Sequence, residues 1–213
     1  MKFEDIKENS NIYLYCGDLP TINQNYTKIS SIGLSLYRSD NYHIRHDITN
    51  KFDLKDNSVD IVQSEDVMEH IEYCKLKATI NEIYRVLKHG GLFRLSMPDY
   101  RCDVLYNRSL KDKDGNIIFD AGGGGNYDSK NNKVINGGHV WFPKYESVKN
   151  LLDNTLFNNS NSSINYLHYY NEEGNSILKK IDYKLGFIKR TPDFDERIRN
   201  PCRPMSIIVD CVK

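Results

Sequence analysis

The strongest constraint on the fold is one amphipathic helix between two short apolar runs. Four apolar residues, spaced at i, i+4, i+7 and i+11, would share one helical face: Leu76, Ile80, Ile83 and Leu87. His89-Gly90-Gly91 is typical of the end of such a helix. The flanking runs Val59–Ser64 and Leu92–Met97 are rich in strand-forming residues. Because strands that alternate with helices form parallel sheets, the sequence predicts an α/β fold.

The rest of the chain extends this pattern. Five further runs predict strands: Ile12–Cys16, Ile29–Leu36, Ile164–Tyr170, Tyr183–Lys189 and Ser206–Val212. Asp66–Glu72 predicts a short helical segment, and Tyr145, Val148, Leu151 and Leu152 predict a second amphipathic helix. The stretch 106–138 is polar, glycine-rich and too long for an ordinary connection, so we expect a lid there.

Composition narrows the classes of function. Lys plus Arg and Asp plus Glu number 29 each, so the overall charge favours neither nucleic acid nor an anionic membrane as partner. No apolar run approaches the roughly 20 residues of a membrane-spanning helix, and the N-terminal residues do not resemble a signal peptide. The five cysteines are scattered without a CxxC pair, which indicates reduced thiols and a cytoplasmic protein.

The most specific text lies in two stretches. His46-Asp-Ile-Thr49 is followed by FDLKDNSVDIVQSEDVMEH at Phe52–His70, and EIYRVLKHGGLFRLSMPD occupies Glu82–Asp99. In order and spacing, these stretches resemble class I S-adenosylmethionine-dependent methyltransferases. In that family an aspartate is followed by the residues DNS, a hydrophobic residue and D at the start of a strand. A hydrophobic residue, E and H then begin a helix, and an RVLKPGG sequence leads into a further strand that ends in PD. The resemblance covers residues 10–100 and continues more loosely to the end of the chain.

The resemblance implies a Rossmann-like class I methyltransferase fold. Its sheet has seven strands and is mostly parallel, with an antiparallel last strand and helices on both faces. We expect a single domain over residues 1–213, in which residues 10–100 bind the cofactor and residues 101–213 supply the acceptor-side elements, including the glycine-rich lid at 106–138. Ligands of such sheets bind outside the carboxyl ends of the strands.

The resemblance also implies the cofactor, S-adenosylmethionine, with S-adenosylhomocysteine as the product. The stretch NIYLYCGDLP at Asn11–Pro20 takes the place of the cofactor loop, with Gly17 near the amino acid moiety and Asp47 near the adenine. Tyr15 stands where a glycine is usual, and Ser35 stands where an acidic residue usually holds the ribose. The predicted cofactor residues are Tyr15, Cys16, Gly17, Ser35, Asp47, Ile48, Ser64 and Glu65.

Methyl transfer to a hydroxyl or amine needs orientation of the two reactants and removal of a proton. The candidate proton acceptors are His139, His70 and Asp99, and His139 is favoured because it follows the glycine-rich segment and lies next to Trp141. Tyr100, Arg101 and Trp141 are the candidate acceptor-binding residues. Alternatively, His70 is a structural histidine and Asp99 a helix N-cap.

The main reading assigns no metal ligands, but a metal site is an open alternative. On a helix, Asp66, Glu69 and His70 would share one face, and His139 would add a fourth ligand. This set resembles the Glu-x-x-Glu-His plus distant His arrangement of metal-dependent methyltransferases that act on RNA ends and quinone precursors.

The hypothesis that follows is a cytoplasmic methyltransferase, and a homodimer is an open alternative. Its acceptor would be a small molecule, a sugar or a phosphoryl-type group resembling a phosphoramidate, methylated on oxygen in surface polysaccharide biosynthesis. Neither nucleic acid nor membrane is expected as a partner. Two alternatives stay open. One is a non-catalytic binding module in which Tyr15 and Ser35 mark lost cofactor affinity; the other is a metal-dependent RNA-end methyltransferase, which the neutral charge disfavours.

Overall fold

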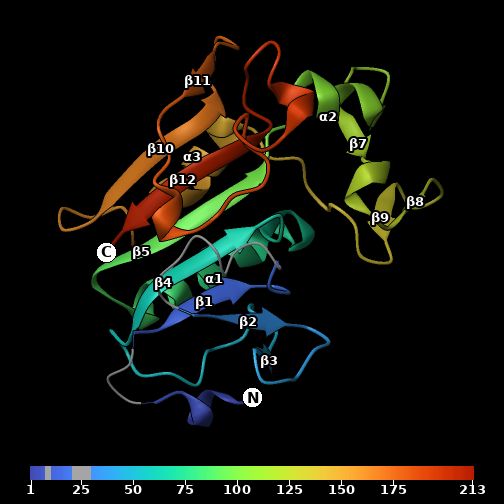
Figure 1. Ribbon diagram of the computed structural model, residues 1–213. Helices are drawn as coiled ribbons and strands as arrows, with labels where there is room; N and C mark the ends of the chain where they lie inside the picture. The colour runs from blue at the N-terminus through green and yellow to red at the C-terminus, as the bar shows by residue number, and fades with distance from the viewer. Residues whose placement is uncertain (8–10, 21–29) are drawn as a thin grey trace.

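The computed structural model describes residues 1–7, 11–20 and 30–213, and its centre is one eight-stranded sheet (Figure 1). The strand order is β11-β10-β12-β5-β4-β1-β2-β3. The strands are β1 (Tyr13–Cys16), β2 (Ser31–Ser35), β3 (His43–Arg45), β4 (Val59–Glu65), β5 (Leu87–Pro98), β10 (Ser163–Tyr170), β11 (Ser176–Leu178) and β12 (Ser206–Val212). Strands β3, β2, β1, β4 and β5 pair in parallel, whereas β12 is antiparallel to both β5 and β10. The predicted mostly parallel sheet with an antiparallel last strand is confirmed.

The strand count differs from the predicted seven. Six predicted strands are present, although Ile29 lies outside the described residues. The prediction for Tyr183–Lys189 is wrong, because that segment contains only the 3-10 turn η5 (Tyr183–Leu185). Strands β3 and β11, of three residues each, were not predicted from the sequence. The single-sheet architecture is unchanged, because both of these short strands lie at its edges.

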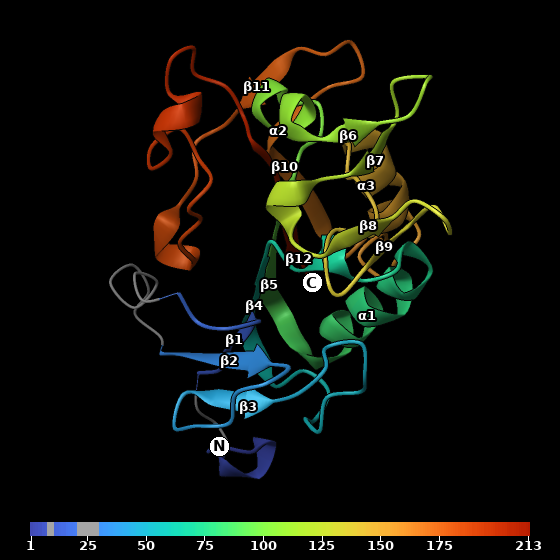
Figure 2. The same ribbon diagram turned by 90° about the vertical axis from the view of Figure 1, so that its right-hand side faces the viewer.

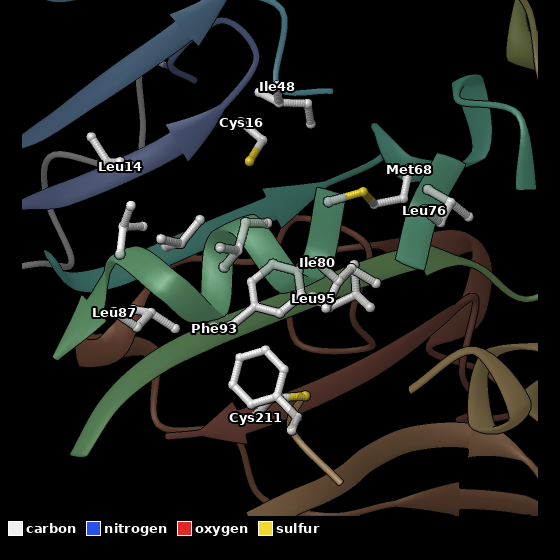
Figure 3. Packing of buried hydrophobic residues seen from close by; sticks show 14 of the residues in the cluster. Leu14, Cys16, Ile48, Met68, Leu76, Ile80, Leu87, Phe93, Leu95 and Cys211 are labelled. Carbon is white, nitrogen blue, oxygen red and sulfur yellow. The ribbon is translucent and has the colours of Figure 1, made fainter. Parts of the chain in front are cut away.

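Two α-helices cover one face of the sheet, α1 (Tyr73–Val86) and α3 (Tyr145–Asp153) (Figure 2). The predicted stripe on α1 is buried against the strands, where Ile80 packs in one core with Phe93 and Leu95 (Figure 3). The helix ends at Val86 instead of at the glycine pair, and Leu87 already belongs to β5. The sequence HGG therefore forms an irregularity within β5, where Gly90 has φ +79°.

In the described residues, the opposite face is covered by the segment 181–199, which carries η5 and η6 (Glu196–Ile198) instead of an α-helix (Figure 2). Arg94 of β5, whose side chain is fully buried, fixes this segment to the sheet. Its guanidinium binds both carboxylate oxygens of Asp210 and donates to the backbone carbonyls of Asp182 and Gly186 at 2.7 and 2.8 Å. The sheet is thus covered by helices on one face and by the irregular segment 181–199, which Arg94 holds in place, on the other.

The glycine-rich stretch between α2 (Asp103–Arg108) and α3 contains secondary structure of its own. It forms two small hairpins, β6 (Leu110–Lys111) with β7 (Ile117–Phe119) and β8 (Asn126–Asp128) with β9 (Lys133–Ile135), separated by the 3-10 turn η4 (Ala121–Gly123). These elements project beyond the carboxyl ends of the parallel strands (Figure 1). That this glycine-rich stretch closes over the acceptor as a lid stays a prediction. The remaining turns are η1 (Phe3–Asp5) and η3 (Met68–His70).

Among the described residues, none of the helices has the length and apolar character that crossing a membrane requires.

Candidate active site

A pocket of about 340 Å³ opens at the carboxyl ends of β1, β2 and β4. This is the edge of the sheet at which α/β folds bind their ligands. Thirteen residues line the pocket: Gly17, Asp18, Leu34, Ser35, Leu36, Tyr37, His46, Asp47, Ile48, Asp66, Val67, His70 and Ile71. We call it the crevice. Four of the predicted cofactor residues are among them, namely Gly17, Ser35, Asp47 and Ile48.

The other four predicted cofactor residues do not line the crevice, and the alternation of side chains along a strand explains part of this. The Cys16 thiol points into the hydrophobic core with Leu14 and Ile80 (Figure 3). The side chains of Tyr15 and Ser64 are buried within the sheet layers. Glu65 accepts a hydrogen bond from the backbone N–H of Lys189 at 2.7 Å, and burial raises its pKa to about 7. A role of these four residues in cofactor binding stays a prediction.

Local backbone geometry shapes the floor of the crevice. Gly17 has φ +101°, a conformation that other residues rarely adopt, and its N–H donates to the carbonyl of Leu34 at 2.8 Å. The Ser35 hydroxyl accepts from the backbone N–H groups of Tyr37 and Arg38, so it closes the turn after β2. Asp47 accepts from the backbone N–H and hydroxyl of Thr49 at 2.9 and 2.8 Å.

The turn after β4 differs from the predicted helix. Asp66 has φ +55°, outside the helical region, and the only helical residues that follow at once are Met68–His70 of η3. Its carboxylate pairs with Arg190 at 3.0 Å. The prediction that Asp66 shares a helical face with Glu69 and His70 is therefore wrong. Asp66 still lines the crevice together with His70, although not from a shared helical turn.

Glu69 and His139 lie side by side in the interior. Glu69 is fully buried, and neither of its carboxylate oxygens has a hydrogen-bond partner among the described residues. Its Oε1 lies 3.5 Å from Nε2 of His139. Desolvation raises the pKa of Glu69 well above its ordinary value, and the neighbouring Asp66 adds to the rise.

A hydrogen-bond network fixes the His139 ring. Its Nδ1 contacts the hydroxyl of Tyr100, which donates to the carboxylate of Asp120 at 2.7 Å. Asp120 also accepts from the guanidinium of Arg108 at 2.6 Å. Because the single Tyr100 proton goes to Asp120, Nδ1 of His139 must be the donor to the Tyr100 oxygen, and Nε2 carries the free lone pair. Burial lowers the pKa of His139 to about 3, so the ring is neutral.

His70 connects this interior cluster with the crevice. Its ring packs edge-on against the His139 ring, with centroids 4.7 Å apart, and its side chain lines the crevice. It is the exposed member of the pair, and one ring nitrogen bonds to the Gly138 carbonyl. Burial of part of the ring lowers its pKa below the ordinary value. An acceptor in the crevice can therefore reach His70 directly, and His139 lies behind it.

The remaining predicted residues have structural partners. Both carboxylate oxygens of the buried Asp99 accept backbone N–H groups, from Arg101 at 3.0 Å and from Tyr170 at 2.9 Å. Arg101 forms an ion pair with Glu146 at 2.6 Å. The indole of Trp141 donates to the carbonyl of Met68 at 2.9 Å. None of them lines the crevice, so a direct role in acceptor binding stays a prediction.

Sequence reasoning missed several residues that shape the cluster. Asp120 and Arg108 hold Tyr100, and Arg190 neutralises Asp66. The glycine run has a steric reason as well: a Cβ atom on Gly123 would lie 2.6 Å from the His139 ring. The run of glycines is visible in the sequence, but the steric reason for Gly123 depends on the side chain of His139, which follows 16 positions later.

Comparison with known proteins finds a similar family for the part of the chain that forms most of the crevice. Residues 25–95, which contain β2, β3, β4 and α1, match the profile of the family described as "Methyltransferase domain". Over this third of the chain, the sequence is similar to that methyltransferase family. The matched segment includes Ser35, Asp47 and His70, so it supplies most of the crevice. No curated protein sequence matches the chain.

Solved structures agree with this methyltransferase fold. An S-adenosylmethionine-dependent methyltransferase from Clostridium acetobutylicum superposes with a TM-score of 0.50 at 13% identity, over 95% of this chain and 83% of its own. S-adenosylmethionine-dependent methyltransferases from Methanosarcina mazei (TM-score 0.48, 12% identity, 99% and 95% covered) and Archaeoglobus fulgidus (0.48, 15%, 97% and 87%) are also similar. At such identities the likeness concerns the fold alone.

Proposed function

We propose that the chain is an S-adenosylmethionine-dependent methyltransferase that transfers the methyl group to an oxygen atom of a small-molecule, sugar or phosphoryl-type acceptor. The observation that carries the proposal is the crevice, because four of the eight predicted cofactor residues and the exposed imidazole of His70 line the same pocket. A methyl donor bound there would meet an acceptor beside that imidazole. A role in surface polysaccharide biosynthesis, with phosphoramidate-like groups as acceptors, is the finer form of the proposal.

The cofactor half supplies the donor site in this proposal. The 13 residues that line the crevice all fall between positions 17 and 71. Gly17 leaves room for close approach at the amino acid end, since no side chain projects from it. Asp47 offers its carboxylate near the adenine, and Ser35 offers one hydroxyl at the ribose. The acceptor half then covers the crevice from the side of the two hairpins.

Proton removal is assigned to the imidazole pair. The sequence favours His139, whose Nε2 carries a free lone pair, but burial lowers its pKa to about 3, which makes this ring a weak base on its own. His70, which is exposed at the crevice, is the imidazole that an acceptor meets first. We therefore expect the acceptor to donate its proton to this pair. Asp99 is the weaker candidate, since both of its oxygens already accept backbone N–H groups.

Calorimetry on the purified chain with S-adenosylmethionine and S-adenosylhomocysteine tests the donor site. We expect both to bind, and Asp47→Ala to weaken binding about tenfold through the loss of a hydrogen bond to a charged group. Asp53→Ala is the matched control, since Asp53 is exposed and lies outside the crevice. Equal affinity of the Asp47 and Asp53 variants would contradict the placement of the adenine.

A non-catalytic binding module is the second candidate, and the turn after β2 favours it. The Ser35 hydroxyl already accepts two backbone N–H groups, so it offers less to a ribose than a free carboxylate would. Absence of binding of either cofactor form to the wild-type chain would support this candidate. Radiolabelled methyl transfer to pooled sugars and phosphorylated sugars would instead support the enzyme.

A further inference from the structure

The cluster of Glu69, His70 and His139 has features that methyl transfer does not require. A fully buried carboxylate without a hydrogen-bond partner is costly, because burial removes its water and nothing replaces it. Both oxygens of Glu69 are in this condition, although the imidazole of His139 lies only 3.5 Å away. Such a group indicates a missing partner of opposite charge.

The three side chains have the spacing of ligands around one ion. A ligand atom from each of Glu69, His70 and His139 lies within 4.8 Å of the others. Metal–nitrogen and metal–oxygen bonds of about 2.0–2.1 Å at tetrahedral angles place neighbouring ligand atoms about 3.3 Å apart. The 3.5 Å between Oε1 of Glu69 and Nε2 of His139 is close to this separation and too long for a hydrogen bond of ordinary strength.

The groups behind the histidines have the arrangement found around metal sites. A ligating histidine usually donates its second N–H to a carboxylate, a carbonyl or a similar acceptor, which fixes the ring and its tautomer. Nδ1 of His139 is engaged by Tyr100, which Asp120 anchors in turn. A ring nitrogen of His70 bonds to the Gly138 carbonyl. Each imidazole therefore has one ring nitrogen left that could bind an ion between the three side chains.

Carboxyl groups outnumber cationic groups in and around the cluster. Four carboxyl groups act on it or belong to it, and two guanidinium groups oppose them: Glu65, Asp66, Glu69, Asp120, Arg108 and Arg190. Arg190 forms an ion pair with Asp66, and Arg108 forms one with Asp120. Neither guanidinium forms an ion pair with Glu69. A divalent cation at the cluster would reduce this imbalance.

We propose that Glu69, His70 and His139 bind one divalent transition-metal cation, with Zn²⁺ as the best-suited ion. Two imidazoles and one carboxylate are the ligands of Zn²⁺ sites that keep a fourth position open. His70 lines the crevice, so the open position faces the acceptor. Asp66, which the sequence placed in the same set, is outside it, since its carboxylate is turned to Arg190.

The bound cation changes how the acceptor loses its proton. A hydroxyl held by such a cation would have a lowered pKa, so the acceptor could release its proton to solvent water in the open crevice while the imidazoles stay ligands. This inference goes beyond the proposed methyl transfer and does not depend on it, because metal binding is measured without cofactor or acceptor.

The test is a titration of the untagged, chelator-treated full chain with Zn²⁺ by calorimetry, repeated with Co²⁺ to read its visible absorption. We expect one ion per chain and Co²⁺ bands typical of four or five ligands. Glu69→Gln and His139→Gln should weaken Zn²⁺ binding at least a hundredfold. Tyr100→Phe, which removes only the outer contact to His139, should weaken it about tenfold.

Matched controls separate this site from adventitious binding. Glu72→Gln and His89→Gln change exposed residues of the same types outside the cluster and should leave Zn²⁺ affinity unchanged. Glu69→Gln keeps the shape of the side chain, so we expect it to fold; if His139→Gln does not, the exposed His70→Gln takes its place. Absence of stoichiometric binding, or equal affinity in Glu69→Gln and Glu72→Gln, would overturn the proposal and leave Glu69 as a buried neutral acid.

Discussion

Gly123→Ala should displace His139 without straining the backbone. A methyl group at this position would lie 2.6 Å from the His139 ring, whereas ordinary contact begins near 3.4 Å. The ring must therefore move by about 0.8 Å, the difference between these distances. It has little space to do so, because Tyr100 holds it on one side and Glu69 lies on the other. Gly123 itself does not have the positive φ that would penalise alanine.

The expected cost is that of inserting one methyl group into a packed site, about 1–3 kcal/mol. For a chain of this size, each kcal/mol lowers the melting temperature by about 2–4 °C, so the shift should be about 2–12 °C. Thermal unfolding by circular dichroism measures it in the presence of a chelator. Nitrogen-15 NMR of the imidazole rings should show an altered His139 Nδ1, because its contact with Tyr100 is stretched.

Gly124→Ala is the matched control. Gly124 has φ +79°, so alanine is strained there by about 1–2 kcal/mol, but its Cβ would meet no atom within 4 Å. Both variants should lose stability, and only Gly123→Ala should change the His139 signals. Unchanged His139 signals and unchanged stability in Gly123→Ala would show that the glycine run is not needed to accommodate the ring.

Three further predictions concern the sheet, the crevice and the pH dependence of stability. Arg94→Met should lower the free energy of unfolding in urea by about 3–5 kcal/mol, because it leaves the mostly buried Asp210 carboxylate and two backbone carbonyls without their donor, whereas Lys88→Met at a more exposed ion pair should cost about 1 kcal/mol or less; equal costs would contradict the anchoring role of Arg94. Ser35→Asp should tighten S-adenosylmethionine binding about tenfold in calorimetry, because a carboxylate accepts both ribose hydroxyls, and unchanged affinity would mean that the ribose lies elsewhere. Burial raises the pKa of Asp99 to about 6, so the folded chain keeps a proton that the unfolded chain loses near pH 4. The Asp99 contribution to stability should therefore fall by about 3 kcal/mol as the pH rises from about 4 to 6, and the difference between wild-type and Asp99→Asn unfolding curves should show this fall.

The parts of the fold that depend on local patterns were predictable. The β4-α1-β5 unit follows from spacing alone, because every buried residue of α1 lies on one stripe. The crevice followed from topology, since the carboxyl ends of parallel strands meet at one edge. Gly17, Ser35 and Asp47 line one pocket, as the sequence predicted, although they are separated along the chain.

The errors arose where a distant side chain decides the backbone. Tyr183–Lys189 has the composition of a strand, but the carbonyls of Asp182 and Gly186 bind the guanidinium of Arg94 on β5, and the segment forms the 3-10 turn η5 instead. Asp66 leaves the helical region and pairs with Arg190, which is 124 positions away. No local pattern contains this information.

The candidate cluster was predicted in part for a similar reason. The sequence named Glu69, His70 and His139, but it assigned Tyr100 to the acceptor. In the structure, Tyr100 is buried and supports His139 through the contact that Asp120 completes. A tyrosine that follows a strand gives no sequence signal that distinguishes these roles.

The position of β12 in the sheet has a consequence for the order in which the protein assembles. This strand is the last in the chain, yet it pairs on both sides, with β5 and with β10. During synthesis, the five parallel strands can pair with one another before β12 is made. Until then, one edge of the 12-residue β5 has no partner strand. An open edge of this length is a template for pairing with other chains. A chain truncated before Ser206 would thus leave the edge of β5 that β12 covers open to pairing with other chains.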